Sequence, residues 1–99
     1  MGASEAEPKG TANRIVMYST RYCPYCIRAR GLFGAKGWEF HEIAVDMSPE
    51  KRAEMTARAG RHTVPQIWIG DKHVGGCDDL FRLDVTGQLE SLVMGANNE

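Results

Sequence analysis

Two cysteines separated by two residues are the strongest chemical signal in this sequence. The motif Cys23-Pro24-Tyr25-Cys26 follows a short apolar segment, residues 15–18, and lies where a helical pattern begins. Only a thiolate attacks a disulfide sulfur, and the amino end of a helix stabilises that anion through unpaired N–H groups and the helix dipole. The spacing lets both sulfur atoms approach bonding distance across one turn. The motif therefore predicts a thiol–disulfide redox centre.

The two cysteines are not equivalent in this arrangement. Cys23 lies at the loop end and is expected to be exposed, whereas Cys26 falls in the first helical turn and is expected to be covered. We therefore expect Cys23 to be the nucleophile and Cys26 to be the resolving thiol. Arg21, two residues before the motif, can add positive charge beside the thiolate.

A second segment, Thr63-Val64-Pro65, has the features of a substrate-binding turn. A proline directly before a strand suggests a turn that contains a cis peptide bond. Because proline has no N–H group, sheet pairing stops there, and the backbone of Val64 is left free for an extended, peptide-like substrate.

A third segment, Gly75-Gly76-Cys77-Asp78-Asp79, combines glycines with an acidic pair at a helix start. The glycines allow close approach of another backbone. The N–H groups of the helix start could hold a carboxylate, while an aspartate side chain holds an ammonium group. A ligand with both charges at one end fits such a site.

The elements that must position these segments follow from hydrophobic periodicity and from helix and turn signals. Their expected order is β-α-β-α-β-β-α(α), with a hairpin turn at Gly70-Asp71 and an interruption of the last helical region at Gly87. The expected ranges are strands at 15–18, 38–45, 66–69 and 72–75, and helices at 24–36, 49–59, 78–86 and 89–93. This order predicts an α/β fold in which helices flank a four-stranded mixed sheet.

Length and composition limit the class of protein. The chain has 99 residues, 42% of them hydrophobic and 25% charged, which is typical of one globular domain. Three cysteines are too few for a disulfide scaffold. A formal net charge of −1 gives no bulk basicity for binding nucleic acid, and the apolar runs are far shorter than the ~20 residues of a membrane span. We expect a flexible tail at residues 1–13, a folded domain at 14–99, and, in the absence of a secretory pattern, a cytoplasmic protein.

Taken together, the three segments resemble those of dithiol glutaredoxins. The matching pieces are CPYC at 23–26, TVPQIWIG at 63–70 and GGCDDL at 75–80, in the order and at the spacing of that family, over residues 14 to about 93. The resemblance implies a thioredoxin fold, a monomer, no tightly bound cofactor and glutathione as cosubstrate. It also implies that protein–glutathione mixed disulfides and protein disulfides are the substrates.

The resemblance further implies which residues contact glutathione. Val64, before a cis Pro65, would pair its backbone with the cysteinyl part. The backbone of Cys77 and the side chains of Asp78 and Asp79 would hold the ammonium and carboxylate groups of the γ-glutamyl part. The expected contacts near the glycyl carboxylate and around the turn are Arg21, Tyr25, Arg61, Thr63 and Gly76.

Alternatives to this interpretation remain at this stage. His73 and Cys77 together with the cysteine pair match zinc ligand types, and some glutaredoxins hold an iron–sulfur cluster with external glutathione. The stiff turn at Pro24 and the long gap between the pairs favour redox chemistry instead. Cys77 is either a small buried residue or a third thiol that oxidises, and His73 is expected to be a solvated strand residue.

Overall fold

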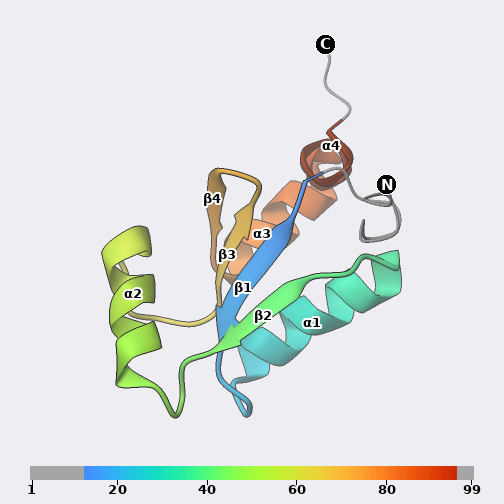
Figure 1. The fold of residues 1–99 in the computed structure, drawn as a ribbon. Helices are drawn as coiled ribbons and strands as arrows, with labels where there is room; N and C mark the ends of the chain where they lie inside the picture. The colour runs from blue at the N-terminus through green and yellow to red at the C-terminus, as the bar shows by residue number, and fades with distance from the viewer. Residues whose placement is uncertain (1–12, 96–99) are drawn as a thin grey trace, which may run out of the picture.

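The computed structural model describes residues 13–95, which form four strands and four helices (Figure 1). In chain order these are β1 Ile15–Ser19, α1 Pro24–Lys36, β2 His41–Ala44, α2 Pro49–Ala59, β3 Gln66–Ile69, β4 Lys72–Gly75, α3 Cys77–Val85 and α4 Gln88–Met94. The order expected from the sequence is confirmed. No helix within this part of the chain is long and apolar enough to cross a membrane.

The prediction of a flexible tail falls largely outside the described residues, since residues 1–12 are not among them. Asn13, which the prediction assigned to the tail, donates a side-chain hydrogen bond to the carbonyl of Leu92 at 2.7 Å. Its backbone N–H also bonds to the carbonyl of Val93 at 2.9 Å. The folded part therefore includes Asn13, one residue earlier than expected.

The sheet has the strand order β2-β1-β3-β4. The first two strands are parallel, with Val16 opposite His41, and both other pairs are antiparallel. The predicted four-stranded mixed sheet is thus confirmed. A parallel pair needs a crossover connection, and α1 supplies it.

Side chains alternate between the two faces of the sheet, and each face has its own core. Ile15 and Met17 of β1 belong to a core that includes Phe33 of α1, Leu80 of α3 and residues of α4. Tyr18 and Trp68 point to the opposite face and pack with Met55 of α2. Because successive strand residues face opposite ways, one strand supplies both cores. Figure 1 shows α2 on one side of the sheet and α1 and α3 on the other.

The helix signals in the sequence act as expected at α1 and α2. Pro24 occupies the first turn of α1, and Gly37 ends the helix with a left-handed φ of 74°. The hydroxyl of Ser48 accepts a hydrogen bond from the N–H of Lys51 and caps α2. The third helix begins at Cys77, one residue before the predicted start, because Gly76 takes the capping position.

The second strand is shorter than predicted. Only His41–Ala44 pair with β1, whereas the pattern suggested residues 38–45. Trp38 and Phe40 precede the strand and are apolar because they pack in the core; the ring of Phe40 lies 5.1 Å from that of Phe33. Their hydrophobicity therefore reflects burial and not strand pairing.

Candidate active site

Cys23 is the capping residue at the start of α1. Its backbone is extended, with φ −77° and ψ 121°, and its carbonyl accepts a hydrogen bond from the N–H of Ile27 at 3.0 Å. Its side chain is partly exposed, and its Sγ donates to the carbonyl of Val64 at 3.8 Å. The predicted position of this sulfur at a helix start, accessible to solvent, is confirmed.

Cys26, by contrast, is fully buried in the first turn of α1. Burial raises the pKa of its thiol to about 11, and a hydrogen bond and charge from Cys23 act in the same direction. A backbone hydrogen bond from Thr20 and the positive charge of Arg30 oppose that rise. The difference in exposure between the two cysteines agrees with the expectation from the sequence.

The loop between α2 and β3 brings Val64 to Cys23. The Val64–Pro65 peptide bond is cis, as predicted. The fully buried side-chain amide of Gln66 donates to the carbonyl of Thr63 at 3.0 Å and to its hydroxyl at 3.3 Å. This amide closes the loop from inside, so the backbone at Val64 is held facing the cysteine sulfur.

A cavity of about 180 Å³ lies beside this loop, and we refer to it as the Asp78 cavity. Residues from α1, from the loop before β3 and from the start of α3 line it. They are Tyr25, Arg61, Thr63, Val64, Pro65, Gly76, Cys77, Asp78 and Asp79. Every residue expected to contact glutathione, except Arg21, is in this set.

The two aspartates of the cavity are in different electrostatic situations. Asp79 accepts a hydrogen bond from the N–H of Gly76 at 2.9 Å and pairs with Arg61 at 3.6 Å and Arg82 at 3.5 Å. Asp78 is exposed and has no ion-pair partner within residues 13–95. One carboxylate therefore caps the helix and anchors Arg61, and the other is free to meet a cation.

Gly75 makes room for the Asp79–Arg61 pair. Its φ is +115°, and a Cβ atom added there would lie 2.3 Å from Oδ2 of Asp79 and 3.1 Å from Nη2 of Arg61. No other residue type fits this backbone and this space without displacing the pair.

Cys77, the third cysteine, is nearly inaccessible at 4% relative exposure. Burial raises the pKa of its thiol above the ordinary value. These features suit a small apolar residue in the cavity wall.

The structure does not bring Arg21 to the Asp78 cavity, where we expected it. Its guanidinium pairs with Asp46 at 3.1 Å, and its backbone N–H bonds to the same carboxylate at 3.2 Å. These bonds hold the pKa of the Asp46 carboxyl below its usual value. The positive charge expected beside Cys23 is thus engaged by a carboxylate on the loop after β2.

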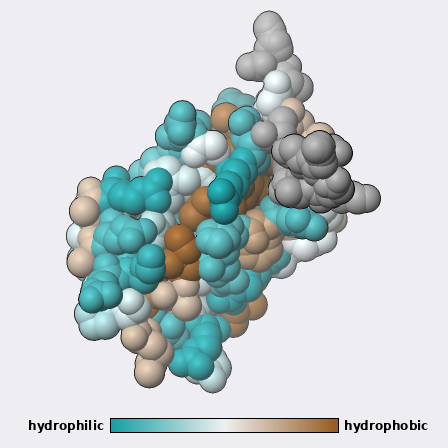
Figure 2. Space-filling model, in the orientation of Figure 1, coloured by the Kyte–Doolittle hydropathy of each residue, from teal (hydrophilic) through white to brown (hydrophobic). Residues whose placement is uncertain are grey.

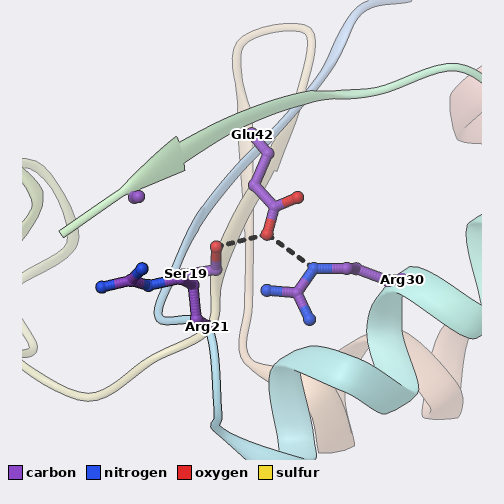
Figure 3. Close-up of a pocket in the computed structure, with 5 residues that line it drawn as sticks. Ser19, Arg21, Arg30 and Glu42 are labelled. Atoms are coloured by element: carbon purple, nitrogen blue, oxygen red, sulfur yellow. Dashed lines mark hydrogen bonds and ion pairs between the residues drawn. The ribbon is translucent and has the colours of Figure 1, made fainter. Parts of the chain in front are cut away.

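Arg21 instead lines a second cavity of about 430 Å³, which we refer to as the Glu42 cavity. Its other lining residues are Ser19, Arg30, Glu42 and Ala44 (Figure 3). The carboxylate of Glu42 accepts hydrogen bonds from the Ser19 hydroxyl and from Nε of Arg30. Arg30 and Glu42 carry no recognisable signal in the sequence, because their partners are distant in the sequence.

His73 is not the solvated strand residue that we expected. Its ring stacks on Trp68 at 4.6 Å and bonds to the amide oxygen of Gln66 at 2.8 Å, and burial lowers its pKa. Within residues 13–95, no three His, Cys, Asp or Glu side chains are grouped so that they could hold a metal ion. The zinc ligand set considered from the sequence is therefore not assembled.

Comparisons with known proteins agree with this geometry. The family model described as glutaredoxin matches residues 15–74. A glutaredoxin of Pseudomonas aeruginosa is 57% identical over 79 residues, covering 80% of this chain and 94% of the relative. Glutaredoxin 3 of Escherichia coli is 48% identical over 79 residues, covering 80% and 95%.

The chain belongs to the glutaredoxin family. Among solved structures, glutaredoxin from Brucella melitensis matches with a TM-score of 0.76 and 46% identity, covering 94% of this chain and 100% of that one. A buckwheat glutaredoxin–glutathione complex matches with a TM-score of 0.76 and 32% identity, covering 90% and 86%. The fold is therefore the thioredoxin fold, and this glutaredoxin is a glutathione-dependent thiol oxidoreductase.

Proposed function

We propose that this glutaredoxin reduces protein–glutathione mixed disulfides and protein disulfides, with Cys23 as the nucleophile and Cys26 as the resolving thiol. The observation that carries the proposal is the position of Cys23. Its sulfur lies at the start of α1, is partly exposed, and contacts the carbonyl of Val64 in the wall of the Asp78 cavity. A sulfur in this position can attack a disulfide whose other half occupies the cavity.

Glutathione fits the chemistry of the Asp78 cavity. The backbone of Val64 offers main-chain hydrogen bonds to its cysteinyl part, as an added strand would. The unpaired carboxylate of Asp78 suits the γ-glutamyl ammonium, and the N–H groups at the start of α3 suit the adjacent carboxylate. At the other end, Arg61 and Tyr25, which also line the cavity, would face the glycyl carboxylate. The relative solved as a glutaredoxin–glutathione complex supports this ligand.

Other lining residues have supporting roles in this proposal. Thr63, Pro65, Gly76 and Cys77 shape the cavity, and Asp79 acts through the helix cap and through Arg61. The position of Arg21 supports no direct contact with glutathione.

The reaction with a glutathionylated protein takes two exchanges. The Cys23 thiolate attacks the glutathionyl sulfur, a bond forms between these two sulfur atoms, and the protein sulfur leaves as a thiolate that takes up a proton. A second glutathione thiolate then attacks the glutathionyl sulfur on Cys23. Oxidised glutathione is released and the Cys23 thiolate is regenerated.

An iron–sulfur cluster carrier is the weaker alternative. The rigid Pro24 at the first turn of α1 suits a dithiol centre better than a cluster ligand. We further propose that the protein acts as a monomer in the cytoplasm, where a reducing glutathione pool can regenerate it.

A turnover assay tests the proposed function. A glutathionylated protein is mixed with the purified wild-type chain, glutathione and an excess of glutathione reductase, and consumption of the nicotinamide reductant is followed. We expect a rate proportional to the chain and saturable in substrate. Turnover that proceeds without glutathione, driven only by a thioredoxin reductase, would contradict the proposal, as would a coloured protein that holds iron and does not turn over.

A further inference from the structure

The Glu42 cavity is lined by Arg21, shortly before the cysteine motif in the sequence, and by Arg30, shortly after it, and contains a polar network. Nε of Arg30 donates to Glu42 at 2.7 Å, and Nη2 of Arg30 donates to the carbonyl of Thr20 at 3.0 Å. The hydroxyl of Ser19 donates to the same carboxylate oxygen of Glu42. Figure 3 shows Ser19 and Arg30 converging on Glu42, whereas the side chain of Arg21 points away.

This network reaches Cys26 by two routes. Arg30 lies four residues after Cys26 on α1, so both side chains leave the same face of the helix. Thr20 accepts from Arg30 through its carbonyl and makes a backbone hydrogen bond to the Cys26 sulfur. Arg30 therefore lies on the same helix face as the buried thiol and binds the loop residue whose backbone bonds to that thiol.

Cys26 depends on nearby positive charge and hydrogen bonds because its thiol must ionise while it is buried. Burial raises the pKa of its thiol to about 11, so only a small fraction is ionised at neutral pH. Two of the influences that raise this pKa come from Cys23. They change once the sulfur of Cys23 is held in a mixed disulfide, whereas the opposing influences of Thr20 and Arg30 remain.

We propose that Arg30, held by Glu42 and by the carbonyl of Thr20, is a positioning residue that promotes attack by the Cys26 thiolate on the mixed disulfide at Cys23. This inference deepens the proposed function and rests on it. In this proposal the Glu42 cavity contributes only to the resolving step. Deglutathionylation that bypasses Cys26 does not need Arg30.

Glu42 holds the guanidinium of Arg30 in one orientation. The side chains of Arg30 and Glu42 are 28% and 29% exposed, so the pair lies at the surface of the cavity and is partly screened by solvent. The planar guanidinium bonds to the carboxylate and to the carbonyl through separate N–H groups. A lysine would keep the charge but could not reproduce both bonds in one plane.

The resolving step balances without another reagent. The Cys26 thiolate attacks Sγ of Cys23, and a disulfide forms between the two cysteines. The bond from Cys23 to the substrate sulfur breaks, and that sulfur leaves as a thiolate and takes up a proton. The substrate sulfur is reduced, and the two cysteines together are oxidised.

A single-turnover reaction with glutathione disulfide isolates this step. The reduced chain is mixed with glutathione disulfide, quenched with acid at successive times, and analysed by intact mass. Formation of the Cys23–glutathione adduct reports the first attack, and its conversion to the internal disulfide reports attack by Cys26. In Arg30→Gln we expect the rate of adduct formation to change by less than about twofold. The rate of conversion to the internal disulfide should fall about three- to fivefold, because the ionised fraction of Cys26 falls more than the nucleophilicity of its thiolate rises.

Four further variants separate this role from a general structural one. Arg28→Gln removes an arginine from the same helix, where Arg28 packs over the ring of Phe81, and both rates should stay at the wild-type value. Arg30→Lys should recover part of the lost resolving rate, because the charge is kept. Glutathione-dependent removal of the adduct should be equally fast in Cys26→Ser and in the Arg30→Gln, Cys26→Ser double variant.

The outcomes distinguish this inference from the proposed function. If no adduct forms at Cys23 of the wild-type chain, both are overturned. An adduct that Arg30→Gln converts to the internal disulfide at the wild-type rate overturns only the inference. Equal slowing of both steps, or slowing that persists in the double variant, shows a general structural effect and also overturns it. If Arg30→Gln does not fold, Arg30→Lys compared with Arg28→Lys provides the same test.

Discussion

The Asp78 cavity and the Glu42 cavity differ in how their charges are used. The Glu42 cavity is the larger, at about 430 Å³ against about 180 Å³ for the Asp78 cavity. Its arginines, however, are already paired, Arg21 with Asp46 and Arg30 with Glu42. In the Asp78 cavity, Asp79 is paired with Arg61 and Arg82, but Asp78 has no ion-pair partner among residues 13–95.

The larger volume of the Glu42 cavity therefore does not identify it as the substrate-binding site. Ions that are already paired have satisfied part of their attraction, as Arg61 has with Asp79, whereas the carboxylate of Asp78, which meets no cation among residues 13–95, can give its full attraction to a ligand. Figure 2 shows one face of the molecule, on which hydrophilic side chains predominate and apolar surface is visible near the middle. In our proposals the Asp78 cavity binds glutathione, and the Glu42 cavity holds Arg30, which promotes attack by Cys26.

The largest expected effect concerns the two cysteines of the motif. Cys23→Ser should abolish deglutathionylation, because the accessible nucleophile is lost, whereas Cys26→Ser should retain it, because a second glutathione can resolve the adduct. Steady-state turnover of a glutathionylated protein by each variant measures this. The opposite ranking would refute the assignment of the nucleophile.

Gly75 tests whether the Asp78 cavity depends on the Asp79–Arg61 pair. Gly75→Ala should destabilise the fold by about 1–3 kcal/mol, since a left-handed backbone and a clash with Asp79 are imposed together. Urea unfolding followed by tryptophan fluorescence measures the loss. The matched control is Gly31→Ala within α1, where a Cβ meets nothing within 4 Å and about 0.5–1 kcal/mol of stabilisation is expected. Equal effects at the two sites would show that the space at Gly75 is not critical.

Asp78 and Arg21 allow a direct comparison of the two cavities as binding sites. Asp78→Ala should raise the KM for glutathione about fivefold, the value of one exposed charge-assisted hydrogen bond of ~1 kcal/mol. Arg21→Ala should leave this KM within about twofold, because Asp46 engages its guanidinium in the other cavity. Steady-state kinetics at varied glutathione give both values. A larger increase for Arg21→Ala than for Asp78→Ala would reverse our assignment of the binding cavity.

The smallest effect concerns stability in acid on the side of the Glu42 cavity. The pKa of Asp46 is lowered, so the ionised form stabilises the folded state above the unfolded pKa of about 3.9, and this contribution is lost as the pH falls through the folded pKa. The urea midpoint of Asp46→Asn should therefore fall less than that of the wild type between about pH 5 and pH 3. Asp71→Asn, in the exposed hairpin turn, is the control. Parallel curves for Asp46→Asn and the wild type would show that the Arg21–Asp46 pair does not contribute.

Much of the fold could be predicted because its signals are local. Pro24 and Gly37 mark the ends of α1, and Gly70-Asp71 marks the hairpin, each through the backbone angles that these residue types prefer. The error at residues 38–45 arose because burial near Trp38 and Phe40 has the same sequence pattern as a strand. Hydrophobicity records that a residue is buried, but not which element buries it.

The candidate site was predictable to the extent that each of its segments has its own signature. Tyr25, Val64 and Asp78 belong to three separate motifs, and the structure brings these motifs together around one cavity. The part that failed was the assignment of charge partners. Arg21 was expected beside Cys23 because the two are near in the sequence, and Arg30 was assigned no role.

The sequence by itself determined which sulfur begins a helix, because that depends on a few neighbouring residues and on the angle that proline imposes. Only the tertiary structure decided which cation each carboxylate meets. Glu42 reaches Arg30 because β2 pairs beside β1, and Asp46 reaches Arg21 because the loop after β2 ends next to the cysteine motif. Electrostatic attraction depends on distance in space, and distance in space between separate elements is set by the packing of the whole sheet.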